Sequence, residues 1–190
     1  GGLKLDHALK TWPELKDLCG RGVVAIDVGS STGGFTDVLL SNSVSKVYAV
    51  DVGKGILDWR LRTDDRVVVM EGINARELTE SSLLPEEERP ELVVCDASFI
   101  HLATVLPAAM ALCAPKAALV ALVKPQFEAH RGEIEAGGVV RDAAVHQRVC
   151  NEAATWLGRQ PGWHVEGIEQ SPITGPSGNI EFLLYGTRQP

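Results

Sequence analysis

Short runs of apolar residues alternate along the whole chain with segments of helical periodicity. The runs are rich in Val, Ile, Leu and Ala and end at turn residues, which is typical of buried parallel strands. We predict strands at Val23–Val28, Lys46–Asp51, Arg66–Glu71, Leu92–Asp96, Ala118–Lys124, Trp163–Glu169 and Ile180–Gly186. We predict helices at Lys4–Leu18, Gly34–Leu40, Ile56–Leu61, Ser81–Glu87, Ile100–Cys113 and Asp142–Gly158. This alternation favours an α/β fold in one domain, with a mainly parallel seven-stranded sheet and helices on both faces.

A glycine-rich loop joins the first predicted strand to the next helix, in the sequence Asp-Val-Gly-Ser-Ser-Thr-Gly-Gly-Phe-Thr-Asp at positions 27–37. Glycines let the backbone approach a ligand closely, and the helix N-terminus presents unpaired N–H groups to an anionic group. The loop lacks the G-x-G-x-x-G pattern, which disfavours a dehydrogenase of the Rossmann type. It is similar to the first motif of methyltransferases that use S-adenosyl-L-methionine (SAM). An ordinary strand-to-helix turn is the alternative for this segment taken alone.

Residues at the ends of the second and third predicted strands are suited to bind a nucleoside. Asp51 follows the loop by about twenty residues, where an acid typically accepts hydrogen bonds from a ribose diol. Asn74 and neighbouring backbone groups are placed to frame an adenine ring. The residues that we expect to bind the cofactor are Asp27, Gly29, Ser30, Ser31, Thr32, Gly33, Gly34, Phe35, Thr36, Asp51, Val52, Asn74, Ala75 and Asp96.

Charged residues close the later apolar runs. The fourth strand ends at Asp96 without the two prolines typical of amino-methylating enzymes, and no cysteine follows a proline, as cytosine C5 methylation would require. The fifth ends at Lys124, and burying an unpaired ammonium group is costly, so Asp96 on the adjacent strand is its natural partner. Glu181 lies within the last apolar run. A buried ion pair that serves packing alone is the alternative interpretation.

Together these segments resemble the FtsJ-like ribose 2′-O-methyltransferases, and within them the TlyA or hemolysin A type. The resemblance rests on the segments at 27–37, 93–100, 122–128, 137–142 and 171–182. It implies a Rossmann-like SAM-dependent methyltransferase fold over residues 1–190 and methylation of ribosomal RNA. It also implies a catalytic tetrad of Lys4, Asp96, Lys124 and Glu181, in which we expect Lys124 to take the proton of the ribose hydroxyl. In full-length relatives a small RNA-binding S4 domain precedes these motifs, and we expect it to be absent from this chain.

The net charge of −7 is unusual for a nucleic-acid-binding protein, because phosphate contacts require Lys and Arg. A missing basic domain would account for it. Four scattered cysteines and the absence of a signal peptide predict a reducing, cytoplasmic setting without a structural metal. The apolar stretch Val105–Val123 reads as a buried helix and strand, because Pro115-Lys116 interrupts it.

Two other functions stay open at this point. A cytolysin is suggested by the hemolysin name, although neither a signal peptide nor a credible membrane span is visible. A SAM-binding ribosome-assembly module without catalysis is the other, which the intact tetrad disfavours. Residues 125–141 form a long connection after the fifth strand, with a possible hinge at Gly137-Gly138 and a possible role as a substrate loop.

Overall fold

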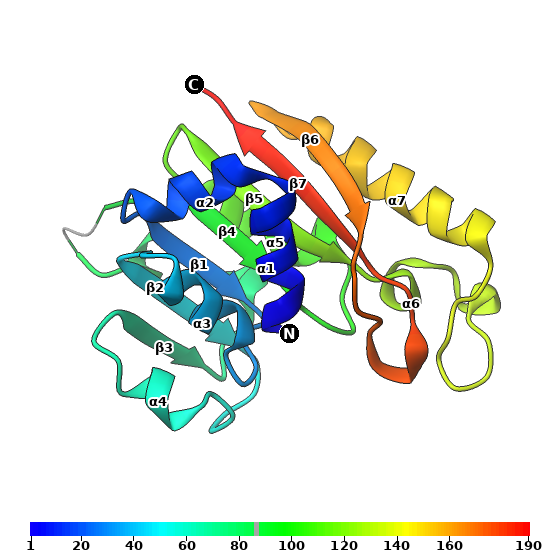
Figure 1. Cartoon of the computed structure of the whole chain (residues 1–190), viewed down its shortest axis with the longest axis horizontal. Helices are drawn as coiled ribbons and strands as arrows, with labels where there is room; N and C mark the ends of the chain where they lie inside the picture. Colours follow the sequence, from blue (N-terminus) through cyan, green and yellow to red (C-terminus); the bar gives the residue numbers. More distant parts are fainter. Residues whose placement is uncertain (86–87) are drawn as a thin grey trace.

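The sheet has seven strands in the order β3-β2-β1-β4-β5-β7-β6. The computed structural model describes residues 1–85 and 88–190 (Figure 1). Strands β1 to β5 run parallel, and β7 is antiparallel to both β5 and β6. The strands are β1 (Val24–Val28), β2 (Lys46–Asp51), β3 (Val67–Glu71), β4 (Leu92–Cys95), β5 (Ala117–Val123), β6 (Trp163–Gln170) and β7 (Phe182–Arg188). The prediction of a mainly parallel sheet is confirmed.

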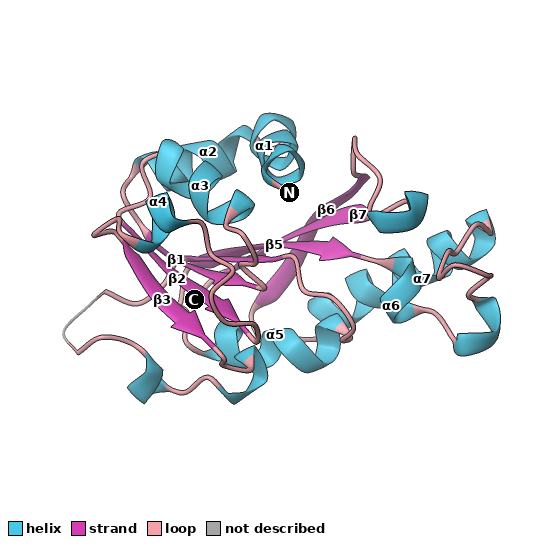
Figure 2. Cartoon of the chain, turned by 90° about the horizontal axis from the view of Figure 1, so that it is seen from below, coloured by secondary structure: helices cyan, strands magenta, loops and turns pink. Residues whose placement is uncertain are grey.

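Helices cover both faces of this sheet, as predicted (Figure 2). One face carries α1 (Gly2–Thr11), α2 (Pro13–Gly20), α3 (Gly34–Ser41) and α4 (Trp59–Arg62). The other carries α5 (Leu102–Ala111), α6 (Pro125–Glu128) and α7 (Ala143–Gly158). Each layer of helices encloses its own buried apolar cluster against the sheet, because both faces of the parallel strands are apolar.

The strand register places the functional segments at one edge. Strand β1 lies between β2 and β4, with Val28 opposite Val50 on one side and Cys95 on the other. Strand order reverses at β1, and such a switch point opens a crevice beyond the carboxyl ends of the strands. The glycine-rich loop follows β1, and therefore begins in this crevice.

The predicted helix over 4–18 is wrong in one respect, because it is two helices. Pro13 occupies the first position of α2, and Trp12 before it has φ −121° and ψ 84°, outside the helical region. A proline disfavours the helical conformation of the residue before it and lacks an N–H group, which ends α1. The break lets the chain turn between α1 and α2 (Figure 1).

Three further helix predictions were too long, and the one at 100–113 extends two residues beyond each end of α5. Helix α4 begins only at Trp59, because the Asp58 side chain caps it by accepting a hydrogen bond from the Arg60 N–H group. The helix predicted at 81–87 is a single 3₁₀ turn, η2 (Glu80–Ser82), followed by non-helical residues. Residues 86–87 of that prediction lie outside the described part of the chain.

The strand ends near the site also differ by a residue or two. Strand β4 stops at Cys95, so Asp96 is the first residue after it. Strand β7 begins at Phe182, so the prediction that Glu181 lies inside a strand is wrong. The connection at 125–141 contains α6 and a 3₁₀ turn, η3 (Arg131–Glu133), and is less irregular than predicted.

The apolar stretch at 105–123 divides into the end of α5 and the strand β5, as the sequence predicts. Over residues 1–85 and 88–190, no helix combines the length and apolar composition that crossing a bilayer requires. The remaining turns are η1 (Ala75–Glu77) and η4 (Pro176–Gly178).

Candidate active site

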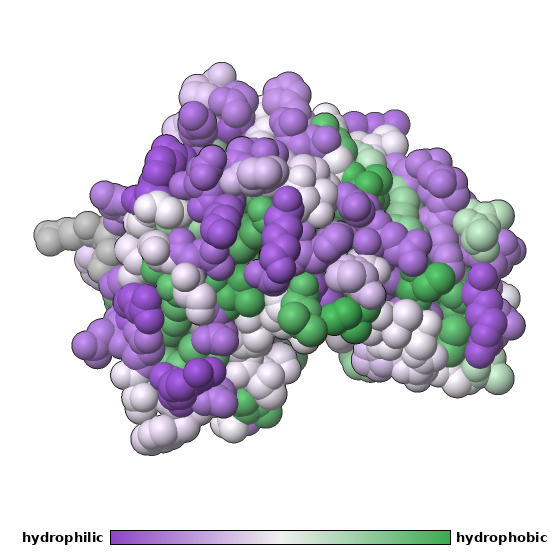
Figure 3. All heavy atoms as spheres, in the orientation of Figure 1, coloured by the Kyte–Doolittle hydropathy of each residue, from purple (hydrophilic) through white to green (hydrophobic). Residues whose placement is uncertain are grey.

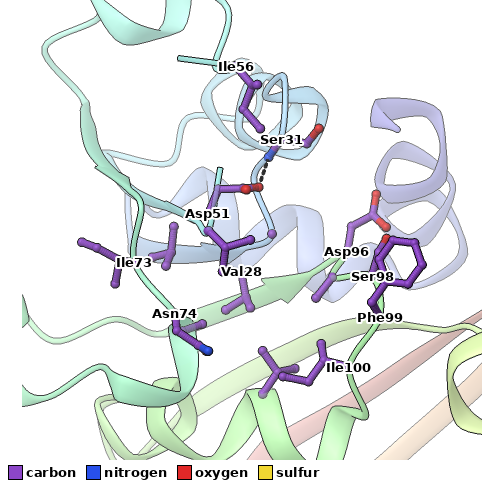
Figure 4. A pocket seen from close by; sticks show the side chains of 16 residues that line it. Val28, Ser31, Asp51, Ile56, Ile73, Asn74, Asp96, Ser98, Phe99 and Ile100 are labelled. Atoms are coloured by element: carbon purple, nitrogen blue, oxygen red, sulfur yellow. Dashed lines mark hydrogen bonds between the residues drawn. The ribbon is translucent and has the colours of Figure 1, made fainter. Parts of the chain in front are cut away.

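A cavity of about 430 Å³ opens beyond the carboxyl ends of β1, β2 and β4 (Figure 4). Seven of the residues predicted to bind the cofactor line it, namely Gly29, Ser31, Asp51, Val52, Asn74, Ala75 and Asp96. A smaller cavity of about 180 Å³ shares Gly29, Ser31 and Asp96 with the first. Four more of the residues predicted to bind the cofactor line this smaller cavity, namely Ser30, Thr32, Gly34 and Phe35. The two cavities therefore lie next to each other, and the glycine-rich loop and Asp96 line both of them.

Asp51 ties the glycine-rich loop to the end of β2. One carboxylate oxygen accepts a hydrogen bond of 2.7 Å from the Ser31 N–H group, which Figure 4 shows as a dashed line. The other oxygen accepts one of 2.8 Å from the Gly53 N–H group. Each oxygen keeps a lone pair for a further donor, so the same side chain that orders the loop can also accept from a ligand hydroxyl.

The glycine at the start of the loop is required by a close approach of two strand ends. Gly29 has φ +78°, and a Cβ atom there would lie 2.8 Å from the carbonyl oxygen of Asp96. The same Cβ would lie 2.9 Å from the Cα atom of Ala97. Only glycine meets both conditions at low cost, so Gly29 allows the end of β4 to close against the loop.

Three predicted cofactor residues, Asp27, Gly33 and Thr36, line neither cavity. The Asp27 carboxyl is fully buried inside β1, where the Thr36 hydroxyl donates to it at 2.7 Å. Its second oxygen is buried and has no partner within the described residues. Burial raises the pKa of Asp27 to about 7, and the nearby charges of Asp96 and Asp51 add to this effect. Asp27 in β1 and Thr36 in α3 therefore hold the two ends of the loop together by a buried hydrogen bond, and Gly33 lies within the loop itself.

The buried Asp27 predicts a pH-dependent stability. The folded chain keeps the Asp27 proton up to a pKa of about 7, whereas the ordinary value is 3.8. Between these values the folded state binds the extra proton, so stability falls as pH rises, by up to about 4 kcal/mol. We expect Asp27→Asn to remove this part of the slope when urea unfolding is measured from pH 5 to 8. Asp37→Asn, on the surface of α3, is the matched control, and equal slopes for Asp27→Asn and wild type would contradict the assignment.

Two ion pairs lie at the ends of adjacent strands, and one of them contains Asp96, which lines both cavities. The Lys124 Nζ atom lies 2.5 Å from Asp96 Oδ1, and Lys4 Nζ lies 2.8 Å from Glu181 Oε1. Lys4 stands on the buried side of α1, next to Leu5 in the sequence. Because Val123 pairs with Phe182 across β5 and β7, Lys124 and Glu181 flank the same end of that strand pair. The structure thus brings all members of the predicted tetrad to one edge of the sheet.

The two ion pairs differ in their access to water. The Asp96 side chain is 24% exposed and borders both cavities, whereas the Glu181 side chain has no exposed surface. Lys124 also donates to the Ser98 hydroxyl at 3.3 Å, and its ammonium lies 5.9 Å from the centre of the Phe127 ring. Of the four side chains in these two pairs, Asp96 is thus the one that a molecule in the cavities can contact directly, and Lys124 lies behind it.

The structure adds residues that the sequence prediction missed. The Gln126 amide donates to Glu181 Oε2 at 2.9 Å. The Phe99 side chain is 88% exposed at the mouth of the larger cavity, with φ +62°, and its ring centre lies 4.7 Å from that of Phe127. These residues stand in the same motifs as Asp96 and Lys124, but motif spacing does not reveal which side chains turn toward the site.

A crevice at the switch point of a mostly parallel sheet, with a glycine-rich loop and an acid at the end of β2, is typical of Rossmann-like folds that bind a nucleotide cofactor. Solved O-methyltransferases with 13–16% sequence identity match this chain with TM-scores of 0.62 or 0.63, a likeness that shows the fold alone. The predicted fold class is confirmed.

The chain belongs to the FtsJ-like methyltransferase family, whose model matches residues 1–188. YqxC of Bacillus subtilis, assigned as an rRNA methyltransferase, is 46% identical over 97% of this chain and 63% of its own length. The 16S/23S rRNA (cytidine-2′-O)-methyltransferase TlyA of Mycobacterium tuberculosis is 48% identical over 84% of this chain and 58% of its own. The chain therefore spans about three fifths of the length of these curated relatives.

A solved structure described as a hemolysin from Streptococcus thermophilus is also similar, with 42% sequence identity and a TM-score of 0.90. The match covers 100% of this chain and 66% of that one. The resemblance stated from the sequence motifs, to the TlyA and hemolysin A type, is confirmed.

Proposed function

We propose that residues 1–190 form the catalytic domain of a SAM-dependent ribose 2′-O-methyltransferase that acts on ribosomal RNA. The observation that carries the proposal is the position of Asp96, which borders both cavities and holds Lys124 at 2.5 Å. A cofactor in the cavities and a proton-accepting group on the strand edge would therefore meet at one carboxylate. The two intact ion pairs favour catalysis over a module that only binds SAM.

The larger cavity fits the chemistry of SAM. Asp51 has lone pairs left to accept from a ribose diol, and Asn74 with Ala75 lies across the cavity, where an adenine can be framed. The loop residues at 29–32 would hold the amino-acid portion through backbone contacts. A fold neighbour from Bacillus cereus was solved in complex with SAH. When bound, SAM supplies an electrophilic methyl group.

Lys124 and Asp96 are the residues that we propose to activate the ribose hydroxyl that accepts the methyl group. A ribose hydroxyl is a weak nucleophile near neutral pH, so transfer benefits from in-line orientation and from removal of its proton. We assign the proton to Lys124 Nζ, which is nearly buried and stands between Asp96 and Ser98. Lys124 can accept it only as a neutral amine, so the ammonium first gives one proton to Asp96 or to water, and the amine then takes the proton of the ribose hydroxyl. Asp96 orients this amine toward the cavities. The acceptor is RNA, since DNA lacks the 2′-hydroxyl group.

We further propose that a basic domain of the S4 type, within the extra length that the relatives possess, supplies much of the RNA affinity. The net charge of −7 leaves this chain poorly suited to phosphate contacts. In Figure 3 the margin toward which the parallel strands point is hollowed, and apolar side chains appear there among hydrophilic ones. This hollow suits a single nucleotide that protrudes from the RNA better than a long duplex. We also propose that the protein acts in the cytoplasm.

The activity is tested by incubating the purified chain, and a full-length relative, with ribosomal subunits and SAM. Mass spectrometry of the digested RNA is expected to show a new 2′-O-methylated nucleoside, with more product from the full-length protein. A DNA oligonucleotide of the same sequence serves as the control and gains no methyl group. Absence of SAM binding in calorimetry at millimolar ligand would overturn the proposal.

Phe99 is suited to stack on a base of the bound RNA. An exposed aromatic ring on a strained backbone is unfavourable for folding alone, so its position points to a ligand. We expect Phe99→Ala to raise KM for RNA by about tenfold, since base–aromatic stacking contributes roughly 1–3 kcal/mol. Trp59→Ala is the matched control, because Trp59 is 73% exposed on α4 and lines neither cavity. Equal KM values for Phe99→Ala and wild type would contradict this role.

A further inference from the structure

The Glu181 carboxylate is held on both of its oxygens. Lys4 Nζ lies 2.8 Å from Oε1, and Gln126 Nε2 donates to Oε2 at 2.9 Å. The glycine at 175 makes room for this arrangement, because a Cβ atom there would overlap the Glu181 carboxylate. The backbone of Gly175 has an ordinary φ of −79°, so the requirement is one of space. The carboxylate is thus fixed in one orientation, without exposed surface.

Gln126 connects this inner ion pair to the outer one. It stands two residues after Lys124, at the second position of α6, whose first position is Pro125. Proline there presets the backbone for a helical turn, so the directions of both side chains are constrained together. One short rigid segment therefore carries Lys124 to Asp96 and Gln126 to Glu181.

The Gln126 side chain is an unfavourable choice for packing alone. It is buried, and its amide oxygen has no hydrogen-bond partner within the described residues. An unpaired buried acceptor is destabilising, and an unbranched apolar side chain such as that of Met would fill the same space without that cost. A buried polar atom without a hydrogen-bond partner is expected mainly at positions where function requires that side chain.

We propose that Gln126 is a positioning residue for methyl transfer. Its amide holds Glu181 in the orientation that pairs with Lys4, and thereby sets the Lys4–Glu181 pair relative to Lys124. The role concerns orientation, so it affects the rate of the chemical step and not the binding of either substrate. This inference rests on the proposed function.

The test compares Gln126→Met and Gln126→Glu with wild type and with Gln147→Met. Gln147 is exposed on α7, where its amide donates to Asn151, which makes it a matched control. We expect Gln126→Met to lower kcat by about tenfold, the effect of losing one hydrogen bond to a charged group, with KM for SAM and RNA unchanged. Gln147→Met keeps the wild-type kcat.

Gln126→Glu gives the readout that a packing role would not produce. The introduced carboxyl can donate to Glu181 only while it holds a proton, so the ratio of wild-type to variant kcat is expected to shrink as pH falls. The same ratio for Gln126→Met is expected to be independent of pH. A wild-type kcat in Gln126→Met, or a pH-independent ratio for Gln126→Glu, would overturn the positioning role.

A failure of the proposed function is distinguishable from a failure of this inference. If wild type transfers no methyl group, a double-mutant cycle on the urea unfolding midpoint still tests the contact, using Gln126→Met, Glu181→Met and the double variant. We expect non-additive shifts, because each single variant leaves one member of the hydrogen bond unpaired. Additive shifts would show that the two side chains act independently, and would overturn the inference.

Discussion

Replacing Lys124 by Ala is expected to lower the rate of methyl transfer to RNA by about 1,000-fold, while the dissociation constant for SAM stays unchanged. Proton removal by a positioned side chain contributes roughly 10²- to 10⁴-fold. Lys124 is nearly buried and contacts Asp96 and Ser98, which both line the larger cavity. The measurement is single-turnover methylation of ribosomal subunits, with SAM binding followed by calorimetry.

Lys116→Ala is the matched control for this variant. Lys116 precedes the first residue of β5, whereas Lys124 follows the last, so the two lysines mark opposite ends of one strand. Removing Lys124 leaves Asp96 without its cation, but the Asp96 side chain is 24% exposed and can be solvated. The variant is therefore expected to fold, which circular dichroism checks. Near-normal transfer by Lys124→Ala would show that another group takes the proton.

Replacing Asp51 by Ala is expected to weaken SAM binding by about 100-fold. Hydrogen bonds to charged groups contribute roughly 1.5–3 kcal/mol each, and this carboxylate would lose both its ligand contacts and its hold on the loop. The bonds to the Ser31 and Gly53 N–H groups keep the loop in the conformation that lines both cavities. Calorimetry with SAM measures the effect directly.

Asp64→Ala separates this effect from a general loss of negative charge. Asp64 lies before β3, at the opposite end of the sheet, where it pairs with Arg66. We expect the dissociation constant of the Asp64→Ala variant for SAM to equal that of wild type. Because Asp51 acts in binding, saturating SAM is expected to restore most of the transfer rate in Asp51→Ala. A wild-type dissociation constant for SAM in Asp51→Ala would contradict the assignment of Asp51 to the cofactor site.

Much of the fold could be predicted from the chain because its signals are local. The second strand was predicted with the bounds that β2 has, since an apolar run between turn residues has few alternatives. The prediction failed where one residue outweighed the periodicity. Pro13 divides the first helix, and the cap at Asp58 shortens α4. The start of β7 was missed because Ile180 and Phe182 continue the apolar pattern through Glu181.

Part of the candidate site could likewise be predicted from the sequence, and part could not. The loop at 29–34 and the acid at Asp51 stand in a recognisable order along the chain, so the sequence alone predicts them. The Lys124–Asp96 pair follows from the adjacency of two parallel strands, and the structure contains it. Gln126 and Phe99 were missed because nothing in their spacing shows that one turns inward and the other outward.

The sequence by itself determined the α/β architecture, the glycine-rich loop and the residue types at the strand ends, because periodicity and turn chemistry act over a few residues. The tertiary structure alone decided that Lys4 meets Glu181 across 177 positions, and that Gln126 joins them. It also decided that Asp27 supports the loop from a buried position. Such pairings depend on how α1, α6 and β7 pack around one edge, and packing between distant segments leaves no local pattern in the chain.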